Sequence, residues 1–388
     1  MLEHWIWLAT RQGLNKRIQY HLLRSFEDPE QVYDATEQAL QEVPGITAKA
    51  LEVLADKSLT QAQQILSKCR HKGIGCLTMD DPDYPRQLLG IMDPPLVLYY
   101  LGNLPDWNTR PVIGAVGTRS CSDYGLRAGE KLGHELSSCG AVVVSGMAEG
   151  VDTAVLTGVL SAEGTPVVFF AGGVDVVYPV SNSGLYRKIL SRGCVLSEYP
   201  PETKHAKWHF PVRNRLISGI SQSVLVVEAP EKSGALITAR HAQKQGREVY
   251  VVPSPIDASS GQGSNTLLKN GAFIAQSAWD ILEHHRAAFP GICKGLTQEK
   301  ASQNSQKEKK VIDNKGKQPY IDVEKKRAVY SPREQAILDQ LRSGPRLTDE
   351  VINDCGLPKS EALAVMTMLE IRGILRRLPG NLMKIEME

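Results

Sequence analysis

The sequence lacks three features that would place it in a large class of proteins: a long hydrophobic run, a Cys-x-x-Cys pair and a secretory signal. No stretch of its 388 residues approaches the roughly 20 apolar residues of a membrane span. The first residues lack the charged start, apolar centre and small-residue cleavage site of a signal peptide. The seven cysteines are scattered, without His neighbours at metal-ligand spacing. We therefore expect a soluble cytoplasmic protein with reduced thiols, no metal site, no cofactor and no membrane contact.

A strong excess of one charge is also absent. The chain carries 45 Lys and Arg against 43 Asp and Glu, which gives a net charge of +2. Any nucleic-acid site must therefore come from local clustering of cations, because the overall field neither favours nor excludes such a ligand. With 42% hydrophobic residues, the chain can bury a large core and form more than one domain.

Residues 73–290 alternate short Val-rich runs with longer helical segments. This alternation is typical of an α/β fold in which helices cover a parallel sheet, because strands buried on both faces are apolar throughout. We expect a doubly wound, mainly parallel sheet. The runs that predict its strands are Pro111–Val116, Ala141–Val144, Pro166–Phe170, Cys194–Ser197, Val224–Val227 and Val249–Val252.

The segments on either side of this region have different patterns. Residues 1–72 predict short helices joined by Gly turns, and Val43-Pro44-Gly45-Ile46 predicts a helix-hairpin-helix (SAM-like) turn. The amides of such a turn can contact DNA phosphates, but the motif is also a packing element, and both interpretations stay open. Residues 291–328 are polar, rich in Lys and poor in apolar residues, which predicts a flexible linker.

Residues 329–388 regain helical periodicity. Two short helices, a longer helix and the Gly380-Asn381 turn between apolar ends predict a winged helix-turn-helix. The longer helix, from Pro358 to about Arg372, carries Lys359 where major-groove readers usually have Arg, Asn or Gln. We therefore favour a partner or self-association surface over sequence-specific reading of DNA.

Glycine-rich loops follow three successive predicted strands. In such a sheet the ligand crevice lies beyond the carboxyl ends of the strands, so these loops meet at one edge. Glycines let N–H groups face outward, a following helix places its positive end there, and an arginine fork suits phosphate oxygens. The alternative is that the glycines only permit tight turns. The residues that predict a phosphate-binding edge are Gly117, Thr118, Arg119, Ser145, Gly146, Gly172 and Gly173.

A segment of cations and aromatic rings follows the fourth of these strands. Trp208 and Phe210 lie among the cations, a combination that tracks a nucleic-acid backbone and stacks its bases. We expect an anionic, phosphate-bearing ligand, with single-stranded DNA favoured, although a solvated charged loop has a similar composition. The Arg-Asn-Arg run is expected to present all three side chains. The polar residues of this prediction are Lys204, Lys207, Arg213, Asn214 and Arg215.

Signatures of common catalytic sites are missing. The chain has no Gly-x-x-x-x-Gly-Lys-Ser/Thr motif, no Gly-x-Gly-x-x-Gly fingerprint and no Gly-x-Ser-x-Gly elbow. Asp152, Asp175 and Glu228 follow predicted strands, where a carboxylate could act as a base or bind ribose hydroxyls. We favour the interpretation that they cap helices or orient arginines, and we predict no catalytic residue.

The core also carries a series of short motifs in a fixed order. They are Tyr84-Pro85, Asp93–Tyr99 with Gly102, Gly117–Arg119, Ser145–Asp152, Gly172–Asp175, Tyr178-Pro179, Ser197-Glu198, Phe210–Arg215, Val227–Ala229, Ser233–Ala239, Gly261–Asn265 and Gly271-Ala272. Together they resemble the DNA-processing protein A family (DprA, also called Smf), over roughly Tyr84 to Ala272.

This resemblance implies an extended Rossmann-like domain that binds single-stranded DNA in a positively charged pocket without cutting it. It further implies protection of incoming strands during natural transformation, loading of the RecA recombinase onto them, and homodimers. The family's phosphate motif falls on Gly117–Arg119 and its Arg-Asn-Arg motif on Arg213–Arg215. Leu156 and Thr157 stand where His and Arg are common in the family, and Ser254 replaces a usual Gly.

Two other hypotheses remain at this point. A nucleotide phosphoribohydrolase of related fold is the main competitor, because Gly172-Gly173 and Glu228 could cradle a mononucleotide. Such enzymes resemble this chain in fold but carry a Pro-Gly-Gly-x-Gly-Thr stretch with a catalytic Glu, which is missing here. The other is a scaffold whose pocket holds only a small anion and which acts through protein partners.

Overall fold

The computed structural model describes residues 2–292, 331–341, 344, 346–371, 374–378 and 382–385. The chain divides into two compact units, Met1–Lys310 and Val311–Glu388, and each is considered by itself. The predicted boundary between residues 72 and 73 falls inside the first unit, and residues 293–328 of the predicted linker lie outside the described residues. The finer division into four segments therefore stays a proposal. No helix in the described ranges is long and apolar enough to cross a lipid bilayer.

Residues 2–72 form short helices, and α2 to α5 begin at polar caps. The side chains of Asn15, Asp28, Thr36 and Thr47 each accept a hydrogen bond from the backbone N–H three residues later, which satisfies a donor that the helix itself leaves unpaired. The predicted Val43–Ile46 turn lies between the fourth and fifth helices. The helices are α1 (Leu2–Thr10), α2 (Lys16–Phe26), α3 (Pro29–Asp34), α4 (Glu37–Gln41), α5 (Ala48–Ala55) and α6 (Thr60–Lys72).

Within residues 73–292 nine strands form one sheet in the order β1-β2-β6-β5-β4-β3-β7-β8-β9. The seven neighbouring strands β6, β5, β4, β3, β7, β8 and β9 are parallel to one another. Strand β2 pairs antiparallel with β6, and β1 pairs antiparallel with β2 at the edge of the sheet. All six predicted strands are present, and the predicted α/β fold is confirmed. The strands are β1 (Gly75–Thr78), β2 (Val97–Gly102), β3 (Val112–Val116), β4 (Val142–Ser145), β5 (Thr165–Phe169), β6 (Cys194–Ser197), β7 (Ser223–Val226), β8 (Glu248–Val251) and β9 (Phe273–Ile274).

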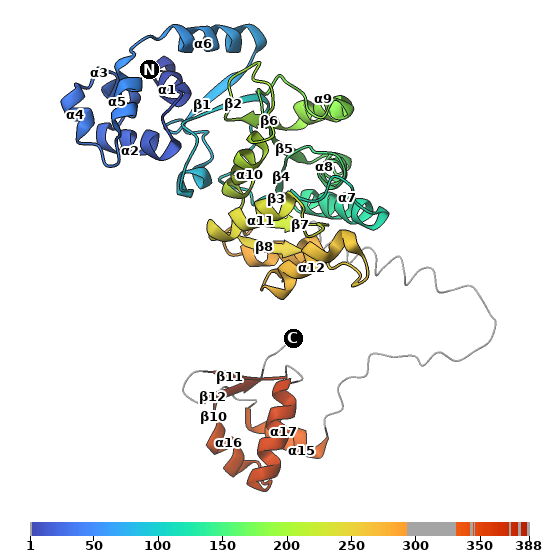
Figure 1. Cartoon of the computed structure of the whole chain (residues 1–388). Coiled ribbons are helices and arrows are strands. Elements are labelled where there is room, and N and C mark those ends of the chain that lie inside the picture. The colour runs from blue at the N-terminus through green and yellow to red at the C-terminus, as the bar shows by residue number, and fades with distance from the viewer. Residues whose placement is uncertain are drawn as a thin grey trace. The chain divides into compact units, whose positions relative to one another are not determined.

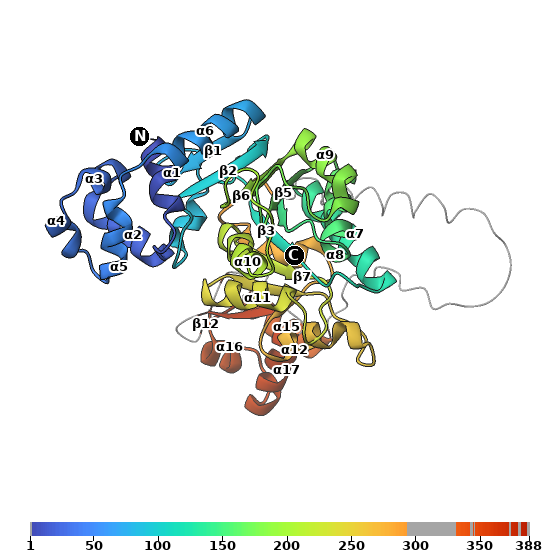
Figure 2. The ribbon, with the colours of Figure 1, turned by 45° about the horizontal axis from the view of Figure 1, so that its top comes forward.

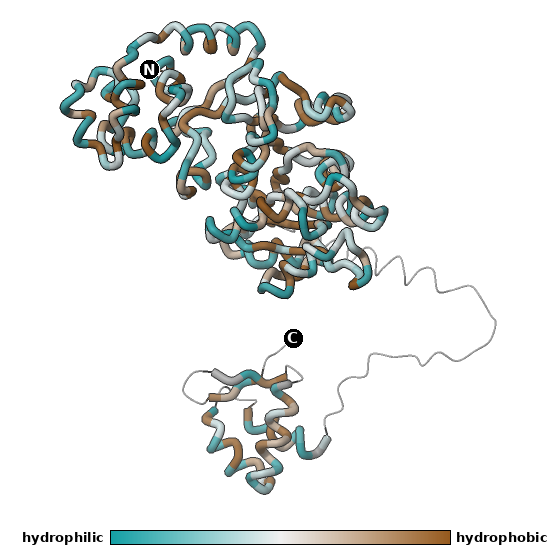
Figure 3. The backbone as a smooth tube through the Cα atoms, in the orientation of Figure 1, coloured by the Kyte–Doolittle hydropathy of each residue, from teal (hydrophilic) through white to brown (hydrophobic). Residues whose placement is uncertain are grey.

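Helices cover both faces of the parallel part of the sheet (Figures 1 and 2). Successive side chains of β3 point to opposite faces, so Ile113 packs with the α7 and α8 side chains and Val112 with those of α10 and α11. The central strands are accordingly hydrophobic along their length (Figure 3). The remaining elements of this unit are η1 (Arg86–Gly90), α7 (Asp123–Ser138), α8 (Val151–Ser161), η2 (Val180–Asn182), α9 (Ser183–Arg192), α10 (His209–Ile220), α11 (Ala235–Lys244), η3 (Ser259–Gly261), α12 (Gln262–Lys269), α13 (Ala278–Leu282) and η4 (Glu283–His285).

Helices α7 and α8 pack with their backbones in contact. A Cβ on Gly133 would lie 2.2 Å from the carbonyl oxygen of Val155, and one on Gly158 would lie 2.0 Å from that of Glu130. Any larger residue would push the helices apart. Because α8 begins directly after the loop that follows β4, this close contact fixes the position of that loop at the sheet edge.

The second unit is the predicted winged helix. Its core is formed by buried side chains that include Ile337, Val351, Met366 and Leu369. The predicted recognition helix is α17, and the Gly380-Asn381 turn lies outside the described residues. The elements are α15 (Pro332–Leu341), β10 (Arg346–Leu347), α16 (Thr348–Asp354), α17 (Lys359–Ile371), β11 (Leu375–Leu378) and β12 (Leu382–Ile385), with the sheet order β10-β12-β11.

A buried group of charges joins the N-terminal helices to the sheet. Glu198 follows β6, and its side chain is only 6% exposed. It pairs with Arg215 of α10 at 2.6 Å and with Lys16 of α2 at 3.1 Å, while Arg215 also pairs with Asp93 at 3.2 Å. Since a buried charge is tolerated only with partners, these contacts hold α2, α10 and the end of β6 in one arrangement.

Replacing Glu198 with Ala is expected to lower the free energy of unfolding by about 3–5 kcal/mol, because Arg215 becomes an uncompensated buried cation. As a control, Glu163→Ala removes a surface partner of Arg192 and should cost less than about 1 kcal/mol. Urea unfolding followed by tryptophan fluorescence measures both, since the five tryptophans all lie in the first unit.

The same substitution should change the pH dependence of stability. Burial would raise the pKa of Glu198, but Lys16 and Arg215 outweigh it and lower the pKa. The stabilisation is therefore complete above the unfolded-state pKa of about 4.3 and is lost as the pH falls through the lower folded-state pKa. Equal unfolding free energies for wild type and Glu198→Ala at neutral pH would contradict this assignment.

Candidate functional site

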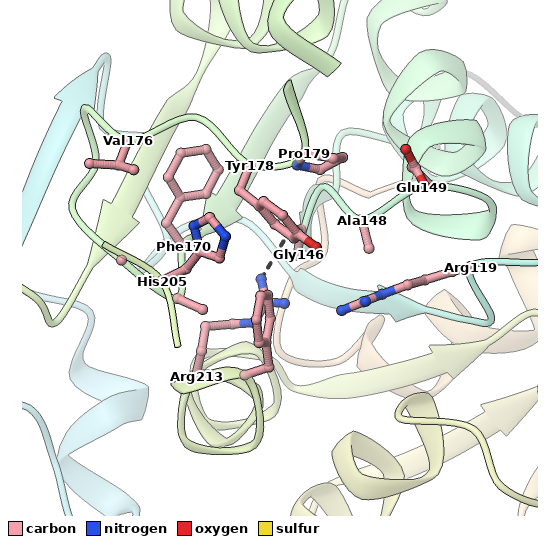
Figure 4. Close-up of a pocket in the computed structure, with 13 residues that line it drawn as sticks. Arg119, Gly146, Ala148, Glu149, Phe170, Val176, Tyr178, Pro179, His205 and Arg213 are labelled. Atoms are coloured by element: carbon pink, nitrogen blue, oxygen red, sulfur yellow. Dashed lines mark hydrogen bonds between the residues drawn. The ribbon is translucent and has the colours of Figure 1, made fainter. Parts of the chain in front are cut away.

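Two connected hollows lie beyond the carboxyl ends of β3, β4, β5 and β7. The larger is a groove of about 1740 Å³, open to solvent, and we call it the long groove. The smaller has a volume of about 460 Å³, and we call it the aromatic pocket because it is lined by Phe170, Tyr178, His205 and Phe210. Arg119 and Arg213 line both hollows. Figure 4 shows the two arginines in the aromatic pocket.

Arg119 is an exposed cation at the rim of both hollows. It belongs to the loop after β3, and its guanidinium lies 5.3 Å from the centre of the Phe210 ring. Thr118 before it is buried, with its N–H bonded to the carbonyl oxygen of Glu228 at 2.8 Å. Gly117 passes so close to α8 that a Cβ would lie 2.5 Å from that of Val151. The loop is therefore held rigidly while the arginine side chain stays free to meet a ligand.

Arg213 is a buried cation that binds the strand ends. Its Nη1 atom donates to the carbonyl oxygens of Phe169 at 2.5 Å and Gly146 at 3.0 Å, and its Nε atom donates to Asn214 Oδ1 at 3.1 Å. Burial lowers its pKa to about 10, against the opposing effect of Asp152 and with a smaller contribution from Arg119. Arg213 is thus still protonated at neutral pH, and it adds positive charge to the pocket wall.

The carboxylates at the strand ends are occupied by local hydrogen bonds. Asp152 Oδ2 accepts from the N–H groups of Gly146 at 3.2 Å and Ala148 at 3.3 Å. Glu228 accepts at 2.8 Å from both the N–H and the hydroxyl of Ser122, directly before α7. Glu228 thus holds Ser122, the residue that caps α7, and Asp152 holds the loop between β4 and α8.

The Gly172-Gly173 loop forms the wall of the aromatic pocket where two loops cross. A Cβ on Gly172 would lie 2.7 Å from the carbonyl oxygen of Thr203, and the N–H of Gly173 donates to that same oxygen at 2.8 Å. Asp175 accepts a hydrogen bond from the N–H of Glu202 at 2.8 Å. The loop after β5 is therefore bound to the loop after β6, and glycine is required by this close approach.

The structure brings some predicted site residues together and separates others. Lys207 and Asn214 line the long groove, whereas Lys204 is exposed and lines neither hollow. Ser145 is fully buried and donates to the carbonyl oxygen of Ala115 at 2.7 Å, so its side chain does not face a ligand.

The prediction that all three side chains of the Arg-Asn-Arg run face the ligand is wrong for Arg215. The run lies in α10, where each residue turns by about 100°, so Arg213 and Arg215 point to nearly opposite sides. Arg213 faces the hollows, and Arg215 is buried against Glu198 and Asp93. Arg215 therefore stabilises the fold and lines neither hollow.

Further residues that line the hollows were not predicted as site residues. The Tyr178 ring lies 4.0 Å from that of His205 and 5.6 Å from that of Phe210. The loop after β7 contributes Lys232, and α11 contributes Thr238, which is only 1% exposed. The sequence could have indicated Lys232 and Thr238, because β7, which precedes them, ends at the same sheet edge as the strands with glycine loops.

The chain matches two family models. One is described as DNA recombination-mediator protein A and covers residues 75–286, and the other is the DprA winged helix domain over residues 325–381. The chain is also 34% identical to Protein Smf of Synechocystis sp., over 97% of this chain and 98% of that protein. It is 39% identical to the DNA processing protein DprA of Bacillus subtilis, over 61% of this chain and 80% of the relative.

Solved structures agree with these matches. The crystal structure of DprA from Streptococcus pneumoniae is 31% identical, with a TM-score of 0.65, and covers 73% of this chain and 98% of its own. DprA from Helicobacter pylori, whose structure describes a single-stranded DNA binding mode, is 29% identical, with a TM-score of 0.50, and covers 55% of this chain and 97% of its own. The shared sheet, winged helix and sequence motifs place this chain in the DNA recombination-mediator protein A (DprA/Smf) family.

Proposed function

We propose that the long groove and the aromatic pocket bind single-stranded DNA without cutting it. The observation that carries this proposal is the convergence of Arg119, Lys207 and Arg213 with the Tyr178 and Phe210 rings at one edge of the sheet. Cations seat phosphates and rings stack on bases, which is the combination that single-strand binders use. The Helicobacter pylori relative, with its single-stranded DNA binding mode, supports the same ligand.

The shape of the aromatic pocket favours a single strand over a duplex. Rings on several sides of the pocket, with Arg119 at its rim, offer stacking surfaces for the face of an unstacked base. A base in a duplex must first leave its stack and its partner, which costs a few kcal/mol, whereas a base in a single strand is already available. Stacking is tolerant of base identity, so we expect little sequence preference.

The carboxylates support a binding role over hydrolysis. Glu228 is 2% exposed, and Ser122 and Ser260 donate hydrogen bonds to it. Asp152 is 5% exposed and binds backbone N–H groups. Neither carboxylate is free to activate water or to hold a ribose, as a nucleotide hydrolase would need.

The cellular role follows from the family. We propose that the protein acts in the cytoplasm, protects incoming single strands during natural transformation and helps to load the RecA recombinase, in keeping with a recombination mediator. We also propose a homodimer. The last strand of the sheet, β9, exposes Phe273 by 44% and Ile274 by 56%, and an apolar strand edge favours pairing with a second copy.

Arg119→Ala is expected to weaken single-strand binding about 10-fold or more, because a charged contact to phosphate is lost. The slope of log K against log salt concentration should fall by about 0.7, as one phosphate contact disappears. Fluorescence anisotropy with labelled single-stranded and duplex oligonucleotides over a salt series measures both. Arg192→Ala, which removes an exposed cation of α9, is the control and should change neither. Equally weak binding by wild type and Arg119→Ala would refute the proposed site.

Tyr178→Ala is expected to weaken single-strand binding by about 1–3 kcal/mol without changing the salt slope, because a stacking surface is lost and no charge is removed. Tyr178→Phe keeps the ring and should retain most of the affinity. The same anisotropy titrations separate the two variants. A loss in Tyr178→Phe as large as that in Tyr178→Ala would show that the hydroxyl, and not the ring, is what matters.

Gly146→Ala is expected to lower both stability and affinity, because its Cβ would lie 2.4 Å from Nη1 of Arg213 and displace the guanidinium. Such overpacking is expected to lower the free energy of unfolding by about 1–3 kcal/mol. Gly184→Ala in α9 is the control, since a Cβ there meets nothing within 4 Å. Thermal unfolding measures the effect on stability, and fluorescence anisotropy measures the effect on single-strand affinity. A Gly146→Ala variant with the stability and affinity of wild type would show that Arg213 does not need its present position.

A further inference from the structure

Two cysteines lie against each other where α6 leads into β1. The Sγ atoms of Cys69 and Cys76 are 3.7 Å apart, and the Cys76 thiol donates to that of Cys69. The residues are seven positions apart in the chain, a spacing that matches no redox or metal motif, so the pair emerges only from the fold. All six cysteines in the described part of the chain are free thiols.

The pair can be reached from solvent. Both cysteines line an open surface pocket together with Leu66, Arg70 and Ile74. Cys76 is half-buried, whereas Cys69 is only 2% exposed. The hydrogen bond from Cys76 lowers the pKa of Cys69, which favours the thiolate needed for attack on an oxidant.

The geometry allows a bond to form with a small local movement. A disulfide requires the sulfur atoms to approach to about 2.05 Å, which is a closure of about 1.7 Å from the present contact. Gly73 ends α6 with φ +65°, and only the short turn that follows it separates the helix from Gly75 at the start of β1. Because Cys69 lies in the last turn of α6 and Cys76 in β1, closure of the bond can draw the end of α6 toward β1.

That same turn holds the wall of the aromatic pocket. Lys72 pairs with Asp175 at 2.5 Å and with Glu202 at 2.9 Å, and Lys68 pairs with Glu202 at 2.6 Å. Asp175 follows the Gly172-Gly173 loop. These ion pairs are partly exposed and individually weak, so a shift of α6 can break them. Cys69 and the two lysines that hold the pocket wall thus lie together within residues 68–72 at the end of α6.

We propose that Cys69 and Cys76 form a reversible disulfide under oxidising conditions, which displaces the last turn of α6 and loosens the pocket wall. With a peroxide as oxidant, the Cys69 thiolate attacks one oxygen to give a sulfenic acid and hydroxide, and the hydroxide takes up the proton that the Cys69 thiol had released and becomes water. The Cys76 thiol then attacks that sulfur and releases a second water. Two thiols and one peroxide thus become one disulfide and two waters, and a dithiol reverses the change. The expected effect on DNA binding rests on the proposed function, whereas the disulfide itself does not.

The first measurement is peptide mapping of the full chain after hydrogen peroxide treatment, without reduction. Trypsin cuts after Arg70 and Lys72, which lie between the two cysteines, so a disulfide would join two separate peptides. The linked peptides should separate after dithiol treatment. Cys76→Ser should abolish this product, and Cys121→Ser, which removes another half-buried thiol, should leave it unchanged. Absence of the linked peptides, or pairing of Cys69 with another cysteine, would overturn the proposal.

The second measurement tests the link to the pocket. Hydrogen–deuterium exchange of residues 171–178 should rise on oxidation in wild type and in Cys121→Ser, but not in Cys76→Ser. Affinity for single-stranded oligonucleotide should fall about fivefold or more in the same two proteins. Linked peptides with unchanged exchange would overturn the link between the thiols and the pocket. If reduced wild type binds no oligonucleotide, the proposed function fails, while the mapping and exchange results still decide this proposal.

Discussion

The buried guanidinium of Arg213 is the interaction on which the ligand edge of the sheet depends. It reaches from α10 to carbonyl oxygens at the end of β5 and just beyond the end of β4. These oxygens lie where the sheet ladder stops, and buried carbonyls need a donor. One side chain therefore satisfies two strand ends and sets the distance between α10 and the sheet. The loops that carry Gly146 and Gly172 are positioned by this arrangement.

The charge of Arg213 also shapes the site. Asp152 lies close enough to stabilise the cation, but its own oxygen is bound by the N–H groups of Gly146 and Ala148. Arg119 stands across the aromatic pocket as a second, exposed cation (Figure 4). A buried charge and an exposed charge thus face the same hollow. This gives the edge a positive field although the chain as a whole is almost neutral.

The sequence was informative where physical constraints are strong. Strands β3 to β8 were predicted because burial on both faces makes them apolar throughout. Three strands, β1, β2 and β9, were missed. β1 and β2 are only partly buried along their length, and β9 has only two residues, both exposed. Arg119 and Lys207 reach the hollows as expected. Arg215 does not, because the helical turn of about 100° per residue separates the side chains of the Arg-Asn-Arg run, and this phase is known only once α10 is known.

The aromatic pocket illustrates a different limit of sequence information. Phe170 belongs to a run that was assigned to a strand, and Tyr178 and His205 come from different loops. Nothing in their spacing along the chain indicates that they share one hollow. Their meeting depends on the crossing of the loops after β5 and β6, which requires Gly172 and Gly173. The close approach of the two loops explains why glycine stands at both positions, and the expected contact of their amides with phosphate stays a prediction.

The ion pairs around Glu198 link the evolution of the N-terminal helices to that of the sheet. Lys16 belongs to the N-terminal helices and Glu198 to the sheet, yet the two form one electrostatic unit with Arg215. A core begun at residue 73 would keep the carboxylate and its arginine and lose the third charge. Exchange of the N-terminal helices for a segment without a cation at this place would therefore leave Glu198 with Arg215 alone. Among relatives, positions 16 and 198 are expected to change together or not at all.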